Sequence, residues 1–303
     1  MTRREWLETV AAALPGGATV LVHEHVLVDF IGADQIRPGR YDPEEVFRAA
    51  KPRLDEIKRL GCRRLLECTP AYLGRDPKLM ARLAGATGLD IWINTGFYGA
   101  ANHKYLPEFA RTAAAGQLAQ VWIREAREGV DGVKPRFIKI GVNNAPLNDL
   151  DRKLVRAAAI AARETGLTAA SHTSGGGPAA LEQIEIFRAE RVSPARFVWV
   201  HAHIEKDHAL HAEAARAGAW VEFDGIAPAS AEWHLDCVRY MARSGLLHRT
   251  LISQDAGWYH AGEPGGGDYR GYTYIYTDFL PRLRPEWVRQ TMAVNPVKAF
   301  GTA

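Results

Sequence analysis

Two histidines stand two positions apart near the start of the chain, in the segment VHEHVLVDF over residues 22–30. On a β-strand, residues two apart point to the same face, so the side chains of His23 and His25 would lie side by side. Neutral imidazole nitrogen is a good ligand for zinc and related divalent metals. The pair therefore suggests a metal site, although an isolated pair of this kind is more often two half-exposed histidines on an edge strand.

Three further polar side chains come at the ends of apolar segments. They are His172 in AASHTS, His201 in WVHAHI and Asp255 in LISQDAGW. Either histidine alone is more often a core residue than a ligand, and a carboxylate at the end of a buried strand is costly unless it is paired. A cation between these residues and the histidine pair would satisfy all five. Because one zinc ion usually takes four ligands, the excess indicates two ions with an anionic bridge between them.

A lysine lies in the middle of an apolar run, FIKIGVN over residues 137–143. A buried ammonium group is expensive unless it is paired, discharged or chemically changed. A positive charge beside two divalent cations would also have the wrong sign. If the Lys139 amine captures carbon dioxide, the resulting carbamate is a bidentate anion that suits the bridge, and nearby divalent cations favour that form.

These residues fall on a regular alternation of short apolar runs and amphipathic segments. We expect eight strands, at residues 18–30, 62–70, 89–98, 135–143, 167–174, 196–204, 219–226 and 249–258. We expect helices at residues 41–61, 76–88, 118–129, 149–166, 177–190, 206–218, 231–245 and 284–301. Eight strand–helix units predict a (β/α)8 barrel, in which reactive groups collect at the carboxyl ends of the strands. A doubly wound sheet is the competing fold, but it usually carries a glycine fingerprint after its first strand, and none follows here.

The composition is that of an ordinary globular protein, with 47% hydrophobic and 24% charged residues in a chain of 303. The formal net charge of +3, without a long basic run, gives no indication of nucleic-acid binding. The three cysteines form no CxxC pair, and residues 1–17 are typical of a short helix rather than an export signal. No apolar stretch reaches the roughly 18 residues of a membrane span. We therefore expect a cytoplasmic protein with a single domain over residues 1–303.

The pattern as a whole resembles the phosphotriesterase family of the amidohydrolase superfamily, over roughly residues 18–301. The segments that carry the resemblance are, in order, VHEHVLVD, FIKIG, SHTSGGGPAALEQIEIF, VHAHIEKDH, VEFDGI, LISQDAGW and NPVKAF. Each segment is a weak signal alone, but the ordered set is specific. The metal ligands that the resemblance implies are His23, His25 and Asp255 for one ion and His172 and His201 for the other, with carbamylated Lys139 and a hydroxide between them. The implied metals are two zinc ions or similar divalent ions such as Mn²⁺, Co²⁺ or Fe²⁺.

The resemblance also implies the reaction. A hydroxide that bridges the two ions attacks an ester-like electrophile, and Asp255 accepts its proton and passes it to the leaving group. Tyr98 matches a tyrosine of lactonase-like members, which favours a carbonyl substrate. The sequence departs from the family at Gly225, where those members carry an arginine, and at Ile204, where an acidic residue is usual, so we expect proton transfer out of the site to use other groups. The substrate contacts that we predict are Tyr98, His203 and Trp258.

We therefore predict hydrolysis of a small polar lactone or a related carboxylic ester or amide. We expect a small-molecule substrate, no nucleic-acid or membrane partner, and a homodimer. Organophosphate phosphotriesterase as the main activity is one alternative. Another keeps the barrel but uses Lys139 as a Schiff-base nucleophile for aldol chemistry, which leaves the histidines unexplained. A third is a metal-loaded barrel that binds a ligand without turning it over.

Overall fold

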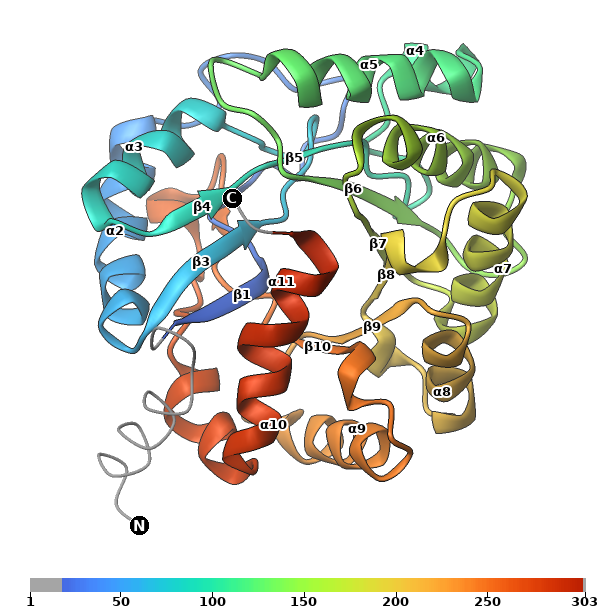
Figure 1. The fold of residues 1–303 in the computed structure, drawn as a ribbon. Coiled ribbons are helices and arrows are strands. Elements are labelled where there is room, and N and C mark those ends of the chain that lie inside the picture. The colour runs from blue at the N-terminus through green and yellow to red at the C-terminus, as the bar shows by residue number, and fades with distance from the viewer. Residues whose placement is uncertain (1–17, 302–303) are drawn as a thin grey trace.

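The computed structural model describes residues 18–301, which form a (β/α)8 barrel with parallel strands inside and helices around them (Figure 1). The strands of the ring are β1 (Thr19–Glu24), β3 (Cys62–Glu67), β4 (Asp90–Trp92), β5 (Asn94–Thr95), β6 (Phe137–Val142), β7 (Ala169–Thr173), β8 (Phe197–Val200), β9 (Trp220–Phe223) and β10 (Thr250–Ile252). Within the two sheets of the ring, each strand pairs with its neighbour in sequence order. The short strands β4 and β5 together take the place of the single strand predicted over residues 89–98.

Two joints connect the two sheets of the ring. On one side, Ile93 alone separates β4 from β5, so the sheet β1-β3-β4 leads directly into the sheet that runs from β5 to β10. On the other side, the chain after β10 runs beside the end of β1. There the Asp255 N–H donates to the His23 carbonyl at 3.1 Å, and the His25 N–H donates to the Ala256 carbonyl at 2.8 Å. This second joint brings the first and last parts of the barrel together at the carboxyl ends of the strands.

The predicted helices appear in the predicted order, with one additional short helix over residues 108–112, and some of them begin or end at recognisable sequence signals. The helices are α2 (Pro43–Arg59), α3 (Pro77–Thr87), α4 (Glu108–Thr112), α5 (Ala115–Glu128), α6 (Asp149–Thr165), α7 (Gly176–Ala189), α8 (His208–Arg216), α9 (Ala231–Arg243), α10 (Pro285–Arg289) and α11 (Asn295–Phe300). The side chain of Asn148 caps the first turn of α6, and Gly166 ends that helix in the left-handed conformation. A π-helical section, Gln290–Val294, divides the closing helix predicted over residues 284–301.

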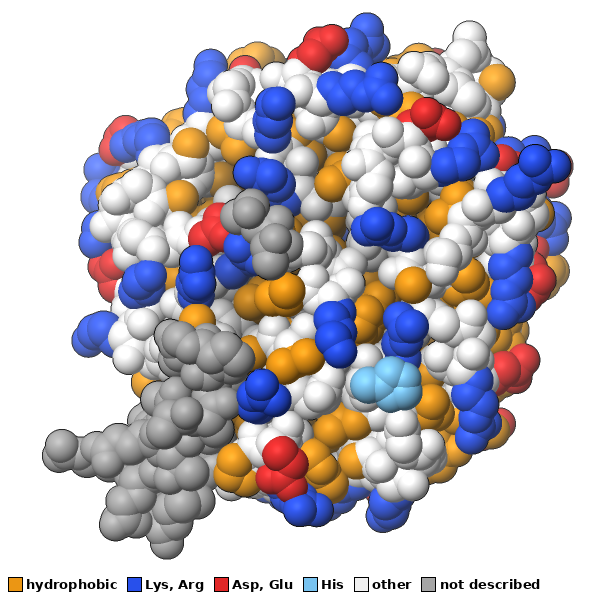
Figure 2. All heavy atoms as spheres, viewed as in Figure 1, with side chains coloured by type: hydrophobic (Ala, Val, Ile, Leu, Met, Phe, Trp, Pro, Cys, Tyr) orange, Lys and Arg blue, Asp and Glu red, His pale blue; other side chains and the backbone are white. Residues whose placement is uncertain are grey.

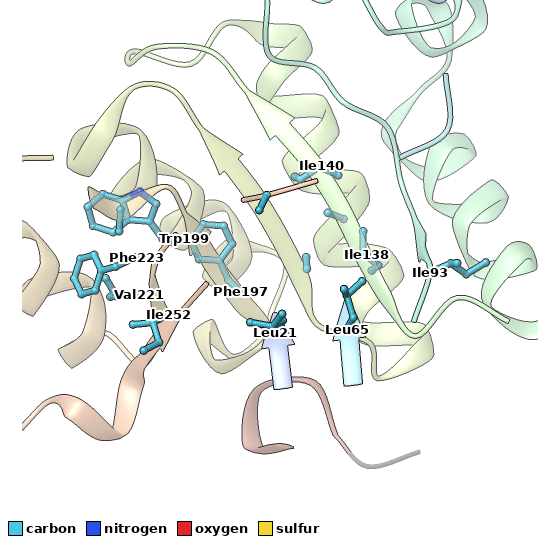
Figure 3. Packing of buried hydrophobic residues seen from close by; sticks show 14 of the residues in the cluster. Leu21, Leu65, Ile93, Ile138, Ile140, Phe197, Trp199, Val221, Phe223 and Ile252 are labelled. Carbon is cyan, nitrogen blue, oxygen red and sulfur yellow. The ribbon is translucent and has the colours of Figure 1, made fainter. Parts of the chain in front are cut away.

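Apolar side chains fill two layers, one on each side of the strands. Residues such as Leu21 and Ile138 belong to the layer between the strands and the helices (Figure 3). Their neighbours Val22 and Phe137 belong to a second cluster that fills the inside of the ring. This alternation is the expected period of a strand, because successive side chains point to opposite faces. The inner cluster forms a floor, and the polar residues of interest lie beyond it along the strands.

The face of the molecule drawn in Figure 2 shows Lys and Arg side chains as scattered groups separated by uncharged atoms. It has no continuous patch of one charge. Among residues 18–301, no helix combines the length and the apolar character that crossing a bilayer requires.

The predicted strands appear in the predicted order, but the observed strands are all shorter than predicted. The segment 18–30 divides into β1 and a short β2 (Leu27–Val28), which pairs with β11 (Tyr259–His260) in a separate two-stranded sheet. The strand predicted over residues 196–204 ends at Val200 in β8, and the strand predicted over residues 249–258 ends at Ile252 in β10. In both cases a residue in the left-handed backbone region follows: His201, directly after β8, has φ 63°, and Asp255, three residues after β10, has φ 52°.

The predicted N-terminal helix over residues 1–17 lies outside the described residues. The prediction of one domain over residues 1–303 therefore stays a prediction at its two ends, while residues 18–301 form one barrel.

Candidate active site

A cavity of about 160 Å³ lies at the carboxyl ends of the barrel strands. All six predicted metal ligands line it, namely His23, His25, Lys139, His172, His201 and Asp255. Two of the three predicted substrate contacts, Tyr98 and Trp258, line it as well. The remaining wall consists of Phe30, Cys68, Pro70, Leu73, Ala101 and Tyr105. Residues scattered over most of the chain therefore meet at one place, as the sequence predicted.

An irregularity in β1 turns His23, and His25 just after the strand, toward the cavity. Between Leu21 and Glu24, β1 has one residue more than its partner β3 has over the matching interval. An extra residue of this kind changes which side chains face inward. Val22 packs inside the ring, and its neighbour His23 faces the cavity together with His25.

Asp255 faces the two β1 histidines across a short gap. Its Oδ1 atom lies 3.2 Å from His25 Nε2 and 3.7 Å from His23 Nε2. This buried oxygen nevertheless makes no hydrogen bond of acceptable geometry within residues 18–301. The rings of His172 and His201 complete the group, with centroids 4.3 Å apart. The site therefore holds an unpartnered carboxylate oxygen among imidazole nitrogens.

Lys139 is 2% exposed and faces imidazole rather than carboxylate. Its Nζ lies 3.4 Å from His23 Nε2, and no carboxylate of the described residues comes within ion-pair distance of it. A bare ammonium group is poorly stabilised in such surroundings, because burial removes its hydration without supplying a counter-charge.

Asp224, just beyond β9, contacts two of the candidate ligands. Its Oδ2 lies 2.8 Å from His23 Nδ1, and its Oδ1 lies 2.5 Å from His201 Nδ1. A carboxylate only accepts hydrogen bonds, so Nδ1 carries the proton in both rings. The lone pair of each ring is then on Nε2. Asp224 therefore fixes the tautomer of both histidines in the form that binds a metal through Nε2.

A second acid, Glu222, shares the His23 nitrogen with Asp224. Glu222 Oε1 lies 2.9 Å from His23 Nδ1. Burial, and after it the nearby Asp224 carboxylate, raises the pKa of Glu222 well above its usual value. Burial acts in the same direction on Asp224, but His201 and His23 outweigh it and hold the pKa of Asp224 well below its usual value. Asp224 is therefore the charged member of the pair.

Burial also sets the charge of the histidine rings. It lowers the pKa of His23 to about 3 and lowers the pKa values of His25 and His172. These rings are neutral near pH 7, which is the form that coordinates metals. His201 differs, because the Asp224 carboxylate outweighs the effect of burial and raises its pKa.

Glu24, which lies between the two β1 histidines, ties β1 to the segment that carries Asp255. Its carboxylate accepts hydrogen bonds from Ser253 Oγ at 2.8 Å, from the Gln254 N–H at 3.1 Å and from the Ala256 N–H at 2.7 Å. The parts of the chain that supply three of the candidate ligands are thus held together as one unit.

The residues that hold the candidate ligands in place were not predicted from the sequence. These are Glu222 and Asp224 on His23, Thr69, whose Oγ1 lies 2.7 Å from His25 Nδ1, and Glu24. The sequence did indicate a role for Glu222 and Asp224, because the apolar segment WVEFDG places these two acids at alternate positions and hence on one face. Thr69 and Glu24 gave no comparable signal, since their contacts depend on how separate strands meet.

Tyr98 and Trp258, which were predicted to contact the substrate, both line the cavity. Tyr98 Oη lies 3.1 Å from His172 Nε2, and burial raises the pKa of the phenol, which keeps it a neutral hydrogen-bond donor. The Trp258 ring packs 4.5 Å from the His25 ring, and its Nε1–H donates to the Asp255 carbonyl at 2.8 Å.

The structure places His203 beside the site rather than in the cavity wall. Its Nδ1 lies 3.2 Å from Asp224 Oδ1, and its ring packs 4.8 Å from that of His234. A Cβ atom on Gly225 would come within 3.1 Å of His203 Nε2. The glycine at this position, one of the departures seen in the sequence, therefore leaves the room that the His203 ring occupies.

The donor atoms fit divalent metal ions. His23, His25 and Asp255 offer two imidazole nitrogens and a carboxylate oxygen within 4.8 Å of one another, and that oxygen is the unpartnered Oδ1. These are ligand types that zinc and related ions take. His23, His201 and Asp224 form a second close group, but there the carboxylate contacts the Nδ1 atoms and orients the rings. His172 and His201 add further nitrogens to the cavity wall.

Fold and site together define the class of protein: a (β/α)8 barrel with a candidate metal centre at the carboxyl ends of its strands. Its sequence matches the model of the phosphotriesterase family over residues 8–295. The chain therefore belongs to the phosphotriesterase family and is a hydrolase, which confirms the family resemblance seen in the sequence and is consistent with the amidohydrolase superfamily.

Curated relatives in this family carry different names. The phosphotriesterase homology protein of Escherichia coli is 29% identical, with 94% of this chain and 98% of that protein covered. An aryldialkylphosphatase of Saccharolobus solfataricus is 30% identical over 60% of this chain and 57% of its own length. N-acetyltaurine hydrolase of Rattus norvegicus is 27% identical over 78% of this chain and 70% of its own length.

Among solved structures, a mutant of the phosphotriesterase-like lactonase of Deinococcus radiodurans superposes with a TM-score of 0.82. The two chains are 26% identical, and the match covers 93% of this chain and 95% of that one. The similar proteins thus include names that refer to a phosphotriester, an amide and a lactone, so the family alone leaves the substrate open.

Proposed function

We propose that this hydrolase uses two divalent metal ions to cleave a small carboxylic ester, lactone or amide. One observation carries the proposal: six side chains from distant parts of the chain line one cavity, with an unpartnered Asp255 oxygen and a buried Lys139 that lacks a carboxylate partner. Each feature is costly in the protein alone and is explained by bound cations with an anionic bridge.

The residues that would hold the ions are His23, His25 and Asp255 on one side and His172 and His201 on the other, with Lys139 as a carbamate between them. Zinc is the first candidate, since imidazole nitrogen and carboxylate oxygen are among its usual ligands. When bound, such ions supply an activated water at neutral pH and polarise the bond under attack.

The side chains of the protein provide the remaining steps. Asp255 lines the cavity, and the carboxylate oxygen that does not hold a metal ion would accept the proton of the attacking water and return it to the leaving group. Tyr98 presents a neutral phenol that can donate to the oxygen of a carbonyl group. Asp224 keeps His23 and His201 in one tautomer throughout.

The cavity wall supports a small substrate with little charge. Its volume of about 160 Å³ is below the about 300–1,000 Å³ of pockets that hold drug-sized ligands. The aromatic and aliphatic wall includes Phe30, Leu73 and Tyr105. The nearby cations are engaged elsewhere, because Lys104 Nζ donates to the Phe30 carbonyl at 2.6 Å and Arg270 donates to the carbonyls of Gln254 and Asp255. This argues for a substrate less polar than the lactone favoured from the sequence.

A substrate panel with metal analysis tests the proposal. The purified protein should contain divalent metal and should turn over one or more small lactones, esters or amides faster than aryl phosphotriesters. Faster turnover of the phosphotriesters would make organophosphates the main substrates. Trapping of a carbonyl compound on Lys139 by borohydride, with activity that survives a chelator, would instead favour the Schiff-base alternative. Bound metal without turnover of any member would favour a binding protein.

Replacement of Lys139 tests the bridging role directly. Lys139→Ala should remove most of the metal and nearly all activity, and short carboxylic acids should restore part of both by replacing the missing carboxylate. Lys78→Ala is the matched control, because this lysine is 75% exposed and lies outside the cavity wall. Full activity and full metal content in the Lys139 variant would overturn the bridging role.

A further inference from the structure

Two histidines on α8 face each other at a distance from the cavity. His208 Nδ1 and His211 Nδ1 are 3.2 Å apart. The opposite nitrogens are both occupied: His208 Nε2 lies 2.9 Å from Asp236 Oδ2, and His211 Nε2 lies 2.8 Å from the Ala202 carbonyl oxygen. None of these residues lines the cavity of the candidate active site.

The hydrogen bonds fix the tautomers of this pair. A carboxylate and a carbonyl oxygen only accept, so each Nε2 carries the proton and each neutral ring has its lone pair on Nδ1. Two lone pairs then face each other at 3.2 Å, which is unfavourable unless a proton or a metal ion lies between them. Burial lowers the pKa of His211 to about 4, so an additional proton on this ring is disfavoured.

A thiol supplies a third donor at the same point. Cys237 of α9 is buried, and its Sγ lies within 4.8 Å of one ring nitrogen of each histidine. Bond lengths at zinc place tetrahedral donors roughly 3.3–3.6 Å apart. The spacing of the two histidine nitrogens is already close to this, and a modest inward shift of the thiol would complete the set.

The surroundings of His208 hold its ring in a defined orientation. The ring stacks between Trp233 at 4.9 Å and Tyr240 at 4.5 Å, with interplanar angles of 17° and 12°. Together with Asp236 and Cys237, these residues are spaced as one face of α9. A carboxylate on the far nitrogen of a histidine is also the usual support of a metal-binding imidazole.

We propose that His208 Nδ1, His211 Nδ1 and Cys237 Sγ bind one zinc-type divalent ion that braces α8 against α9, separately from the ions of the active site. Binding releases the thiol proton to solvent, and the thiolate together with the Asp236 carboxylate balances the two positive charges. The side chain of His208 is 19% exposed, which gives the ion a way in and leaves water as its fourth ligand. The proposal does not depend on the proposed function.

Cobalt titration of the metal-free, full-length protein tests this site, because a thiolate bound to Co²⁺ gives a charge-transfer absorption in the near ultraviolet. The wild-type protein should show this absorption. Cys237→Ser should lose it and bind one equivalent of cobalt fewer than the wild type. Cys68→Ser is the matched control, because Cys68 lines the active-site cavity and its replacement should leave the absorption unchanged.

His208→Gln provides a second variant at the partly exposed position and should lose the same equivalent of cobalt. Thermal melting of each variant verifies that it is folded. The proposal is overturned if the wild-type protein lacks the absorption, if Cys237→Ser keeps it, or if Cys68→Ser abolishes it. An absorption lost only with Cys68 would place the cobalt–sulfur contact in the active site.

Discussion

At the scale of single residues, the orientation of the candidate ligands depends on one carboxylate. Asp224 accepts from His23 Nδ1 and His201 Nδ1 and also from the His201 N–H at 3.2 Å. Of these two histidines Glu222 contacts only His23, and its Oε2 has no hydrogen-bond partner within residues 18–301. The two acids are two positions apart on the same strand face, so they form a natural pair for comparison.

Asp224→Asn should weaken metal binding by about 10–100-fold, the usual cost of losing a group that orients a ligand. The amide can no longer accept from both histidines with two oxygens, so at least one ring loses its fixed tautomer. Glu222→Gln should have a much smaller effect, because it removes one shared contact. Metal titration against a competing chelator measures both variants. Equal affinity in Asp224→Asn and the wild type would contradict the orienting role.

The residue types of the site were predictable, whereas their supports were only partly so. His23, His25 and Lys139 could be recognised because such side chains are unusual within apolar strands. The contact of Thr69 with His25 joins residues on different strands, and no local pattern specifies it. His203, which was predicted to contact the substrate, lies outside the cavity wall, and its position depends on the space left by Gly225.

At the scale of elements, the placement of Lys139 depends on how closely β5 approaches β6. The two strands pair in parallel at Asn94 with Phe137 and Thr95 with Ile138. The next residue, Gly96, has φ 122°, and a Cβ atom there would lie 2.1 Å from the Lys139 carbonyl oxygen. Only glycine therefore allows this approach.

Gly96→Ala should destabilise the protein by about 3 kcal/mol or more, since it combines backbone strain with overpacking beside Lys139. It should also lower the metal content. Gly85→Ala is the matched control, because a Cβ atom at this exposed position of α3 meets nothing within 4 Å. The control should gain about 0.5–1 kcal/mol from improved helix propensity. Denaturant unfolding of both variants measures the difference, and equal stability would show that β5 can move away at little cost.

The order and type of the elements followed from hydrophobic periodicity, while the ends of the strands did not. Periodicity shows where side chains must be buried, but it does not report the left-handed backbone conformations of His201 and Asp255, which follow β8 and β10. The same conformations direct two candidate ligands into the cavity. The extra residue in β1 was hidden for a similar reason, because it appears only when β1 is paired with β3.

At the scale of the whole molecule, the candidate ligands come from segments distributed around the ring. His23 belongs to its first strand and Asp255 follows its last strand, while Lys139 and His172 lie on β6 and β7 and His201 comes directly after β8. Ions bound between them would connect the joint between β1 and β10 to the opposite side of the barrel.

Removal of metal should therefore lower the melting temperature of the whole barrel together with its activity. Bound ligand at a free concentration of 1,000 times its Kd adds about 4 kcal/mol to the free energy of unfolding. Added zinc should reverse both changes. The Cys237→Ser variant should retain the part of this shift that comes from the active site, and Lys139→Ala should lose most of that part. A melting temperature that is insensitive to chelation would exclude metal as a structural link across the ring.

The homodimer expected from the sequence remains a prediction at this scale. Light scattering of the purified protein measures it directly, and a mass near 33.5 kDa would show a monomer instead.

The candidate metal ligands and the aromatic wall of the cavity come from different parts of the barrel. The candidate metal ligands lie on strands or shortly after them, whereas Phe30, Tyr105 and Trp258 belong to the connecting segments. The Phe30 ring packs against the other two, with centroid distances of 6.1 Å to Tyr105 and 5.6 Å to Trp258. A library randomised at these three aromatic positions would sample new substrate preferences while the reactive centre stays intact. The molecule thus offers directed evolution a small set of starting positions.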